Sequence, residues 1–225
     1  MSLLRSLLDL VLPPRCCACG RPGTLFCPAC QAAVEPWHPV CPACKRPAPT
    51  GATHPPCRSR SPLAGQAVAG LYAGPLAAAV RALKYQNRRG LARPLADLLV
   101  LGPLSDLPAP GVIVPVPLHP SRQRLRGYNQ SALLAAELGT RLGVRDFPGA
   151  LIRVRPTAPQ VGLDAAARRE NVRDAFRCPD PAVVRGLTVW LVDDVVTTGA
   201  TVTEAARVLR RAGARQVWAV AVAHD

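Results

Sequence analysis

The chain has 225 residues, of which 49% are hydrophobic and 19% are charged, and this balance excludes a disordered protein. Its length fits one ordinary domain with a small appendage. The formal net charge of +14 indicates phosphate-rich partners such as nucleic acids, phosphorylated metabolites or an anionic membrane surface, although arginine codon bias in a GC-rich genome would produce the same balance.

The N-terminal segment, residues 1–16, has leucines at helix-like spacing that Asp9 interrupts. This pattern predicts a short amphipathic helix that packs on the rest of the protein, with contact to a membrane surface as the alternative. No apolar run in the sequence approaches the ~20 residues that a transmembrane helix needs. No small-residue cleavage site follows the leucines, so the pattern does not predict a secretion signal. We therefore expect a cytoplasmic protein without a membrane span.

Eight of the nine cysteines lie between residues 16 and 57, and six of them form three Cys-x2-Cys pairs. Each such pair can direct two thiolates at one metal ion, and two pairs complete a tetrahedral zinc site. Disulfides are the alternative, but the sequence has no secretion signal and the spacing is that of zinc sites. The first zinc site is predicted to consist of Cys16, Cys19, Cys27 and Cys30. Cys17 is then a spare thiol.

The second zinc site is less complete. Cys41 and Cys44 form one pair, and Cys57 supplies a third thiolate. His54 precedes Cys57 by the same two-residue gap, whereas Arg60 stands where a further cysteine would follow. Two interpretations remain open: His54 completes a site of three cysteines and one histidine, or this half of the segment has lost its metal. We expect so small a segment to need structural Zn2+ in order to fold.

From residue 66 onward, apolar runs alternate with helical patterns. Strands are predicted at residues 66–73, 111–117, 187–194 and 216–224, and helices at 75–86, 130–143 and 200–214. Such alternation is typical of βαβ units, so we predict an α/β fold with a mostly parallel sheet flanked by helices. The expected domains are a zinc-ribbon domain at 1–62 and the α/β domain at 63–225.

The stretch VWLVDDVVTTGAT, residues 189–201, places two adjacent carboxylates at the end of a predicted buried strand. Asp193 and Asp194 repel each other, and the rest of this stretch contains no lysine or arginine. Ligands of parallel sheets bind beyond the carboxyl ends of strands, and the turn at 197–201 offers N–H groups and hydroxyls to a phosphate. The acids can accept hydrogen bonds from vicinal hydroxyls and attract Mg2+. We therefore predict a ribose 5-phosphate site in which Mg2+ and sugar hydroxyls offset the two acids.

This stretch resembles the phosphoribosyl pyrophosphate (PRPP) motif of type I phosphoribosyltransferases. Other matching segments are the cysteine pairs, ALKY around Lys84, VPVPLHPSRQRLRGYNQ from residue 114 and TAPQVGLDAAARRENVRDAF from residue 157. With them, nearly the whole chain resembles the ComF/GntX family, phosphoribosyltransferase-like proteins with an N-terminal double zinc ribbon. Arg60 departs from the pattern, because such proteins usually have their eighth cysteine there.

The resemblance implies roles for residues at matching positions. Asp193 and Asp194 would hold the ribose hydroxyls, and the 5-phosphate would lie on Thr197, Thr198, Gly199, Ala200 and Thr201. Pro115 and Val116 match the pyrophosphate loop, which Arg122, Arg124 and Arg126 follow; a solvated basic loop is the alternative for these arginines. Lys84 would be a pyrophosphate contact or else a surface lysine.

Residues 157–171 resemble the mobile loop of the family. Gln160, Arg168 and Asn171 match its glutamine, arginine and asparagine, and they are the candidates for catalytic loop residues. Asn129 is expected to cap the next helix, and His119 is interpreted as structural.

The resemblance implies a Mg2+-dependent transfer of phosphoribosyl from PRPP to an acceptor that the sequence does not identify. The family is associated with natural transformation and the uptake of single-stranded DNA. A non-catalytic PRPP sensor that binds single-stranded DNA or a competence helicase is therefore the alternative. Aromatic residues make up only 4% of the chain, which weakens DNA binding as the sole function because stacking platforms are scarce.

Overall fold

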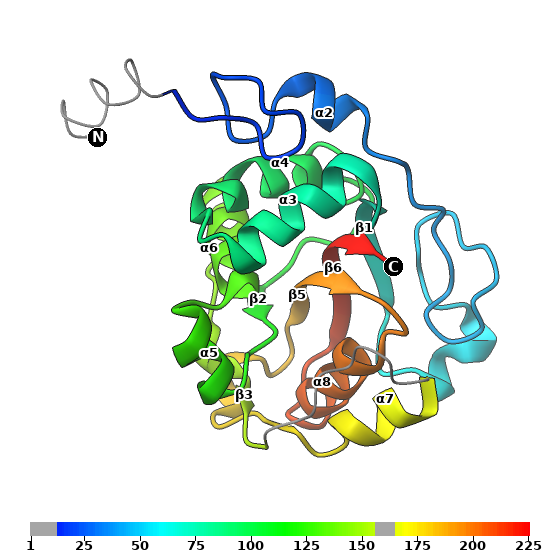
Figure 1. Ribbon diagram of the computed structural model, residues 1–225. Coiled ribbons are helices and arrows are strands. Elements are labelled where there is room, and N and C mark those ends of the chain that lie inside the picture. The colour runs from blue at the N-terminus through cyan, green and yellow to red at the C-terminus, as the bar shows by residue number, and fades with distance from the viewer. Residues whose placement is uncertain (1–12, 156–164) are drawn as a thin grey trace.

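The computed structural model describes residues 13–155 and 165–225 (Figure 1). The helix predicted at 1–16 falls almost entirely outside these residues. The centre of the molecule is a sheet of four parallel strands in the order β1-β6-β5-β2. The strands are β1 (Gly65–Leu71), β2 (Val112–Pro115), β5 (Thr188–Val196) and β6 (Gln216–His224). The predicted α/β class and the parallel sheet are confirmed.

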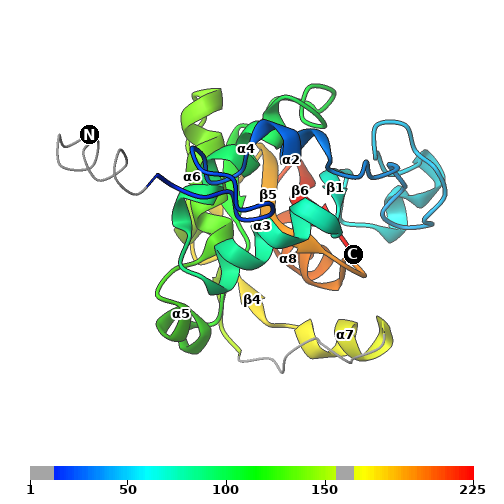
Figure 2. The ribbon, with the colours of Figure 1, turned by 45° about the horizontal axis from the view of Figure 1, so that its top comes forward.

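Helices cover both faces of this sheet, as Figures 1 and 2 show. One face packs in a core with α3 (Gly74–Tyr85), α4 (Ala92–Val100) and α6 (Gln130–Leu142), and the other packs against α8 (Ala200–Arg211). Strands β5 and β6 are buried almost throughout because both of their faces are covered. The predicted helices at 75–86, 130–143 and 200–214 are confirmed to within three residues at each end. Helix α4 was not predicted.

Smaller elements complete the described part of the chain. They are α2 (Pro28–Ala32), α5 (Pro120–Arg126), α7 (Ala165–Val172), the antiparallel pair β3 (Ile152–Arg153) and β4 (Phe176–Arg177), and short 3-10 helices at Pro55–Arg60, Arg89–Leu91, Pro148–Ala150 and Pro181–Val183. In the described ranges, no helix has both the length and the apolar character that crossing a bilayer requires.

The first cysteine-rich loop, residues 13–33, is called the first knot. It lies over helices α3 and α4 (Figure 1). Phe26 and Cys27 are buried in the same core as Leu76 and Leu83 of α3. Arg88 donates a hydrogen bond to the carbonyl of Arg15 at 3.0 Å. The first knot is therefore packed against the α/β body through side chains of the main core.

The second cysteine-rich loop, residues 39–60, is called the second knot. Its buried residues Cys41, Ala48 and Cys57 form a small cluster of their own. Backbone hydrogen bonds join it to the edge of the sheet, including one of 3.0 Å from the amide of Gln66 to the carbonyl of Gly51. A Cβ at Gly51 would lie 2.0 Å from the Gln66 carbonyl oxygen, so only glycine permits this approach.

The domain division at residue 62 stays a prediction.

Candidate functional site

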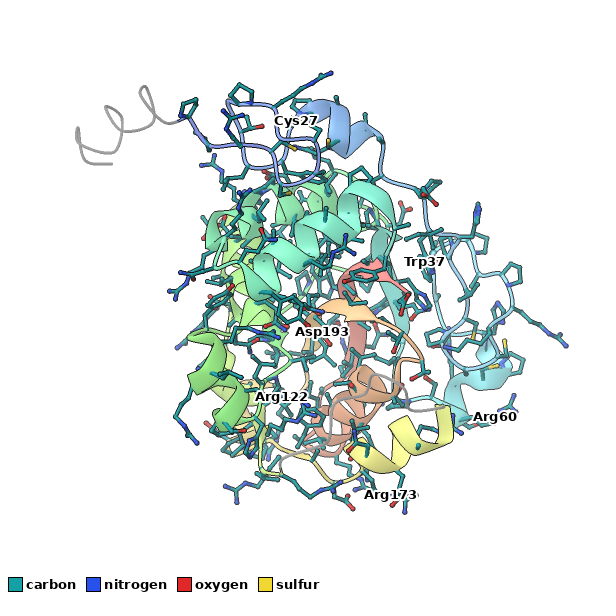
Figure 3. All side chains as sticks on the ribbon, viewed as in Figure 1. Cys27, Trp37, Arg60, Arg122, Arg173 and Asp193 are labelled. Atoms are coloured by element: carbon teal, nitrogen blue, oxygen red, sulfur yellow. The ribbon has the colours of Figure 1, made fainter. Side chains whose placement is uncertain are left out.

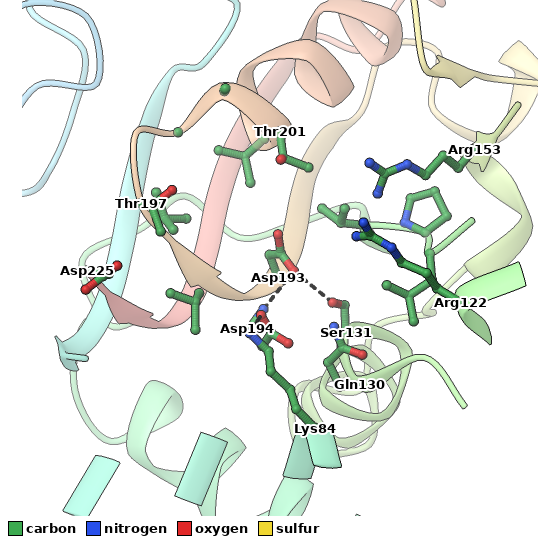
Figure 4. Close-up of a pocket in the computed structure, with 18 of the residues that line it drawn as sticks. Lys84, Arg122, Gln130, Ser131, Arg153, Asp193, Asp194, Thr197, Thr201 and Asp225 are labelled. Atoms are coloured by element: carbon green, nitrogen blue, oxygen red, sulfur yellow. Dashed lines mark hydrogen bonds and ion pairs between the residues drawn. The ribbon is translucent and has the colours of Figure 1, made fainter. Parts of the chain in front are cut away.

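A cavity of about 420 Å³ opens at the carboxyl ends of the parallel strands (Figure 4). It is bordered by the end of β5, the first turn of α8, the end of α3 and the segment after β2. Its volume is within the range of small-molecule sites, roughly 300–1,000 Å³. The predicted location of the ligand, beyond the strand ends, therefore coincides with a cavity.

The acidic pair lies on one wall of this cavity. Asp193 accepts a hydrogen bond from the Ser131 hydroxyl and another from the amide of Asp194, both at 2.9 Å. Asp194 is only 3% exposed, and its Oδ1 lies 2.8 Å from the Nζ of Lys84. Figure 4 shows Lys84 reaching the pair from α3 and Ser131 from α6.

The ion pair corrects two interpretations of the sequence. Mg2+ and sugar hydroxyls were expected to supply all the compensation for the acids, because the neighbouring segment has no cation. Instead the chain supplies a cation of its own from a distant helix, Lys84. The surface-lysine alternative is also wrong, because the Lys84 side chain is 16% exposed.

The turn after the acidic pair begins at Thr197 as expected, but it is shorter than predicted, and the strand before it extends two residues beyond its predicted end. Strand β5 continues to Val196 because its pairing with β6 extends to that residue. Gly199 then takes a left-handed φ of 79° and caps α8, which begins at Ala200. The amide of Ala200 donates to the Thr198 hydroxyl at 3.4 Å. Within the turn, Thr197 and Gly199 line the cavity, as do Ala200 and Thr201 at the start of the helix, and Thr198 does not.

Burial and neighbouring charges shift the pKa values of Asp193 and Lys84 on this wall. Burial and the neighbouring Asp194 charge raise the pKa of Asp193 to about 7. Burial lowers the pKa of Lys84, but the charge of Asp194 and a hydrogen bond to it outweigh this effect, and the pKa is raised. The Oδ2 atom of Asp194 is buried and has no hydrogen-bond partner in the described part of the chain. That oxygen is available to a ligand donor or a cation.

The opposite wall carries arginines (Figure 4). Arg122 and Arg126 of α5 line the cavity together with Arg153 of β3, whereas Arg124 does not. Arg153 is 9% exposed, and burial together with the nearby Arg122 charge lowers its pKa to about 10. Two cations held close together in a partly desolvated wall favour an anionic ligand. Sequence reasoning missed Arg153, although an arginine within the apolar segment ALIRVR was a signal.

Some of the other predicted residues line the cavity, and others lie outside it. Val116 lines the cavity and Pro115 does not. Asn129 caps α6 as predicted, accepting a hydrogen bond from the amide of Ser131 at 3.1 Å. This cap fixes the start of the helix that bears Ser131, a contact of Asp193 that sequence reasoning missed. His119 has the expected structural role, because its side chain caps α5 by accepting from the amide of Ser121 at 3.3 Å.

The loop candidates are only partly described. Gln160 lies outside the described residues, and so does the side chain of Arg168. Asn171 lies in α7 and is not among the residues that line the cavity.

Two clusters of metal-ligating side chains lie in the two knots. Within each cluster, the ligand atoms are within 4.8 Å of one another. The first cluster is Cys16, Cys19, Cys27 and Cys30, and the second is Cys41, Cys44, His54 and Cys57. Four thiolates, or three thiolates with one imidazole, are donor sets that fit structural zinc. All the cysteines are free thiols, and Cys17 belongs to neither cluster.

The second cluster includes His54, whose role as a metal ligand the sequence spacing left open. The Nδ1 atom of His54 lies 3.4 Å from the sulfur of Cys44. Its Nε2 atom lies 3.1 Å from the carbonyl oxygen of Pro47, a contact that suits a ring donating from Nε2 and binding metal through Nδ1. The Arg60 guanidinium donates to the Cys57 sulfur at 3.7 Å.

Comparison with known proteins gives two domain matches. Residues 129–225 match the phosphoribosyl transferase domain, and residues 7–58 match the double zinc ribbon domain. The chain is 38% identical over 165 residues to competence protein F of Haemophilus influenzae, covering 68% of this chain and 71% of that protein. It is 44% identical over 154 residues to the DNA utilization protein YhgH of Salmonella typhi, covering 65% of this chain and 67% of that one.

A more distant likeness connects the chain to solved structures. Glutamine phosphoribosylpyrophosphate amidotransferase from B. subtilis is 24% identical with a TM-score of 0.38, covering 59% of this chain and 25% of that one. This likeness is too weak to add to the domain matches.

Proposed function

Since this chain belongs to the ComF/GntX family, we propose that its cavity binds PRPP together with Mg2+. The observation that carries the proposal is the separation of chemistry across the cavity. Carboxylates and a helix N-terminus occupy one wall, and arginines occupy the other. PRPP has hydroxyls and a phosphate at one end and a pyrophosphate at the other, which is the same division.

Each part of the ligand has a matching set of side chains. Asp193 and Asp194 would accept hydrogen bonds from the ribose hydroxyls, with the Lys84 ammonium holding Asp194 in place. The N–H groups of the first turn of α8 would bind the 5-phosphate, since a helix N-terminus presents unpaired donors and a positive dipole. The guanidinium groups of Arg122 and Arg153 would bind the pyrophosphate.

The acidic pair also fits Mg2+. Carboxylate oxygens are the ligands that Mg2+ prefers, and the Oδ2 atom of Asp194 is buried without a hydrogen-bond partner among the described residues. Asp193 and Asp194 would hold the ion, which when bound would offset negative charge on the pyrophosphate. The chain's own contribution to the transfer is to orient the ribose between the two walls and to stabilise the leaving group with arginines.

The reaction that we propose is transfer of the phosphoribosyl group to an acceptor still to be identified. Gln160, Arg168 and Asn171 remain the candidates for catalytic loop residues. Free thiols in two zinc-type clusters favour a reducing compartment, so we place the protein in the cytoplasm.

A second candidate function is a non-catalytic PRPP sensor that binds single-stranded DNA or a competence helicase. The names of the relatives favour it, because they refer to competence and to DNA utilization. The net charge of +14 also favours a nucleic-acid partner. Incubation with PRPP, Mg2+ and a panel of bases and amines separates the two: release of pyrophosphate with any acceptor identifies the enzyme.

PRPP binding is tested best with Asp193→Asn. Loss of charge-assisted hydrogen bonds worth about 2 kcal/mol should weaken PRPP binding roughly 30-fold in calorimetry with Mg2+. Asp106→Asn, an exposed change of the same kind, serves as the control. Asp194→Asn is unsuitable, because it would leave the buried Lys84 ammonium without its partner and destabilise the fold by roughly 3 kcal/mol.

The pKa of Asp193, about 7, adds a pH dependence to this test. The carboxyl loses its proton as the pH rises through that value, so the charged form that accepts hydrogen bonds and binds Mg2+ becomes dominant. PRPP affinity should therefore increase between pH 6 and pH 8, a window of roughly one unit on either side of that pKa. The increase should be smaller in Asp193→Asn, where only the phosphate groups of PRPP still titrate in this range, with a second pKa of about 6.

A further inference from the structure

A second cavity, of about 570 Å³, lies between the second knot and helices α7 and α8. Five cationic side chains from these elements line it. They are Lys45 and Arg60 from the second knot and adjoining helix end, Arg169 and Arg173 from α7 and the residues after it, and Arg207 from α8. Figure 3 shows Arg60 at the end of the second knot that faces α7. Cations converge here from segments far apart in the sequence.

The lining contains two carboxylates, and both of them pair with a single cation, Arg207. Arg207 lies 3.0 Å from Asp174 and donates to Glu204 at 2.8 Å. Arg173 pairs at 2.8 Å with Glu170, but both side chains are 65% exposed, and such pairs contribute only about 0–1 kcal/mol. The positive charge of the other cations therefore exceeds the negative charge that the lining supplies.

Lys45 adds an independent sign that this lining is built for a ligand. It follows the second cysteine of its pair and has a left-handed φ of 61°. Gly20 stands at the same position of the first knot with a φ of 75°, as expected where glycine is favoured. Holding a lysine in this conformation costs roughly 1–2 kcal/mol. The second knot thus carries a strained cation where the first has a glycine.

Arg60 occupies a position that the metal site does not use. The fourth ligand atom of the second cluster comes from His54, so residue 60 is not needed for metal binding. Its guanidinium lies beside the Cys57 sulfur and also lines the cavity. Residue 60, three positions after Cys57, therefore places a cation at the cleft and no ligand on the metal.

The rest of the lining defines the chemistry of the ligand. Ser61, Thr198 and Thr203 contribute hydroxyl groups, and the described lining has no aromatic side chain on which a base could stack. From these observations we propose that this cleft binds phosphate groups of a second phosphorylated ligand. Thr198 belongs to the turn whose other residues face the first cavity, and Ala200 lines both cavities. The two sites share a wall, but the second is built from different cations and does not depend on PRPP binding in the first.

The test uses the full zinc-loaded chain and two probes, inorganic tripolyphosphate and a labelled oligothymidylate of about 12 nucleotides, a length typical of single-strand sites. The variant is Arg60→Gln with Arg169→Gln. The control, Arg81→Gln with Arg211→Gln, removes the same charge from exposed positions outside both cavities. The cleft variant should bind the preferred probe about tenfold more weakly and, for the oligonucleotide, reduce the salt slope by about two. The control should stay within about twofold of the wild type.

The two probes separate the sources of phosphate. Binding of tripolyphosphate alone identifies a small phosphorylated ligand, and binding of the oligonucleotide identifies a phosphodiester backbone. Arg169→Gln alone, which leaves the knot untouched, keeps the test valid should Arg60→Gln lower the zinc content. Equal losses in cleft and control variants, binding of neither probe, or a loss caused instead by Arg122→Gln in the first cavity would overturn the proposal. Because PRPP affinity is measured separately with Asp193→Asn, either proposal can fail alone.

Discussion

The two knots have the same metal-binding plan but are attached to the body in different ways. The first buries Phe26 and three of its cysteines in the core shared by α3, α4 and the sheet. The second keeps its own small cluster and is joined to the edge of β1 by backbone hydrogen bonds. A stack of Trp37 on His224, with ring centroids 5.7 Å apart, fixes the segment between the knots.

This difference indicates a division of roles. Burial of apolar side chains contributes more to the free energy of folding than exchangeable hydrogen bonds do. The first knot is therefore part of the structural core, and the second is a surface module whose cations line a cleft. The second knot adds little to the main core, which only its Ala52 contacts among its described apolar residues. Its surface can therefore change without unfolding the body, and Lys45 and Arg60 are cations on that surface.

The largest expected effect is on the stability of the whole protein, which should depend much more on the metal site of the first knot than on that of the second. Cys27→Ser should destabilise the whole protein by about 3 kcal/mol or more, because metal binding and core packing are lost together. For a chain of this size the melting temperature should fall by roughly 6–12 °C. Cys57→Ser should lose its metal but lower the melting temperature of the body by less than about 3 °C. Thermal unfolding followed by circular dichroism measures both, and equal shifts would refute the division.

A second prediction concerns the metal content of each knot. The wild type should contain two zinc ions per chain, one for each cluster of four ligands. His54→Ala should reduce this to one, whereas the control His38→Ala should leave two. Adding Arg60→Cys to His54→Ala should restore the second ion, because a cysteine at position 60 completes a Cys-x2-Cys pair with Cys57. Unchanged zinc after His54→Ala would remove this histidine from the ligand set.

The smallest expected effects on stability come from substitutions at Lys45 and Gly20, the equivalent left-handed positions of the two knots. Lys45→Gly should stabilise the second knot by about 1 kcal/mol, because glycine adopts this backbone without strain. Amide exchange of residues 39–60 should slow by roughly fivefold. Gly20→Lys should destabilise the first knot by a similar amount, measured by thermal unfolding. No change in either variant would show that the lysine is not strained.

Much of the fold could be predicted because it is encoded locally. The apolar run before Asp193 and the helical pattern after Gly199 fixed the strand, the turn and the helix in order. Helix α4 was missed because Pro94 in its first turn reads as a break. Helix α5 has no buried residue, so no apolar periodicity revealed it.

The acidic pair could be identified from the sequence, but its partners could not. Lys84 and Ser131 reach it from helices distant in the sequence, and only the packing of those helices on one face of the sheet brings them to β5. Arg153 reaches the opposite wall from a short strand outside the main sheet. Local motifs therefore predicted where the cavity lies, and tertiary packing determined the charge balance of its walls.

The most direct test of the proposed function is a calorimetric titration of the full chain with PRPP and Mg2+ at pH 8. The wild type and Cys57→Ser should both bind one PRPP with similar affinity, because the second knot does not line the first cavity. Asp193→Asn should bind roughly 30-fold more weakly. PRPP binding that is equally tight in Asp193→Asn, or absent from the wild type, would contradict the assignment of this cavity to PRPP.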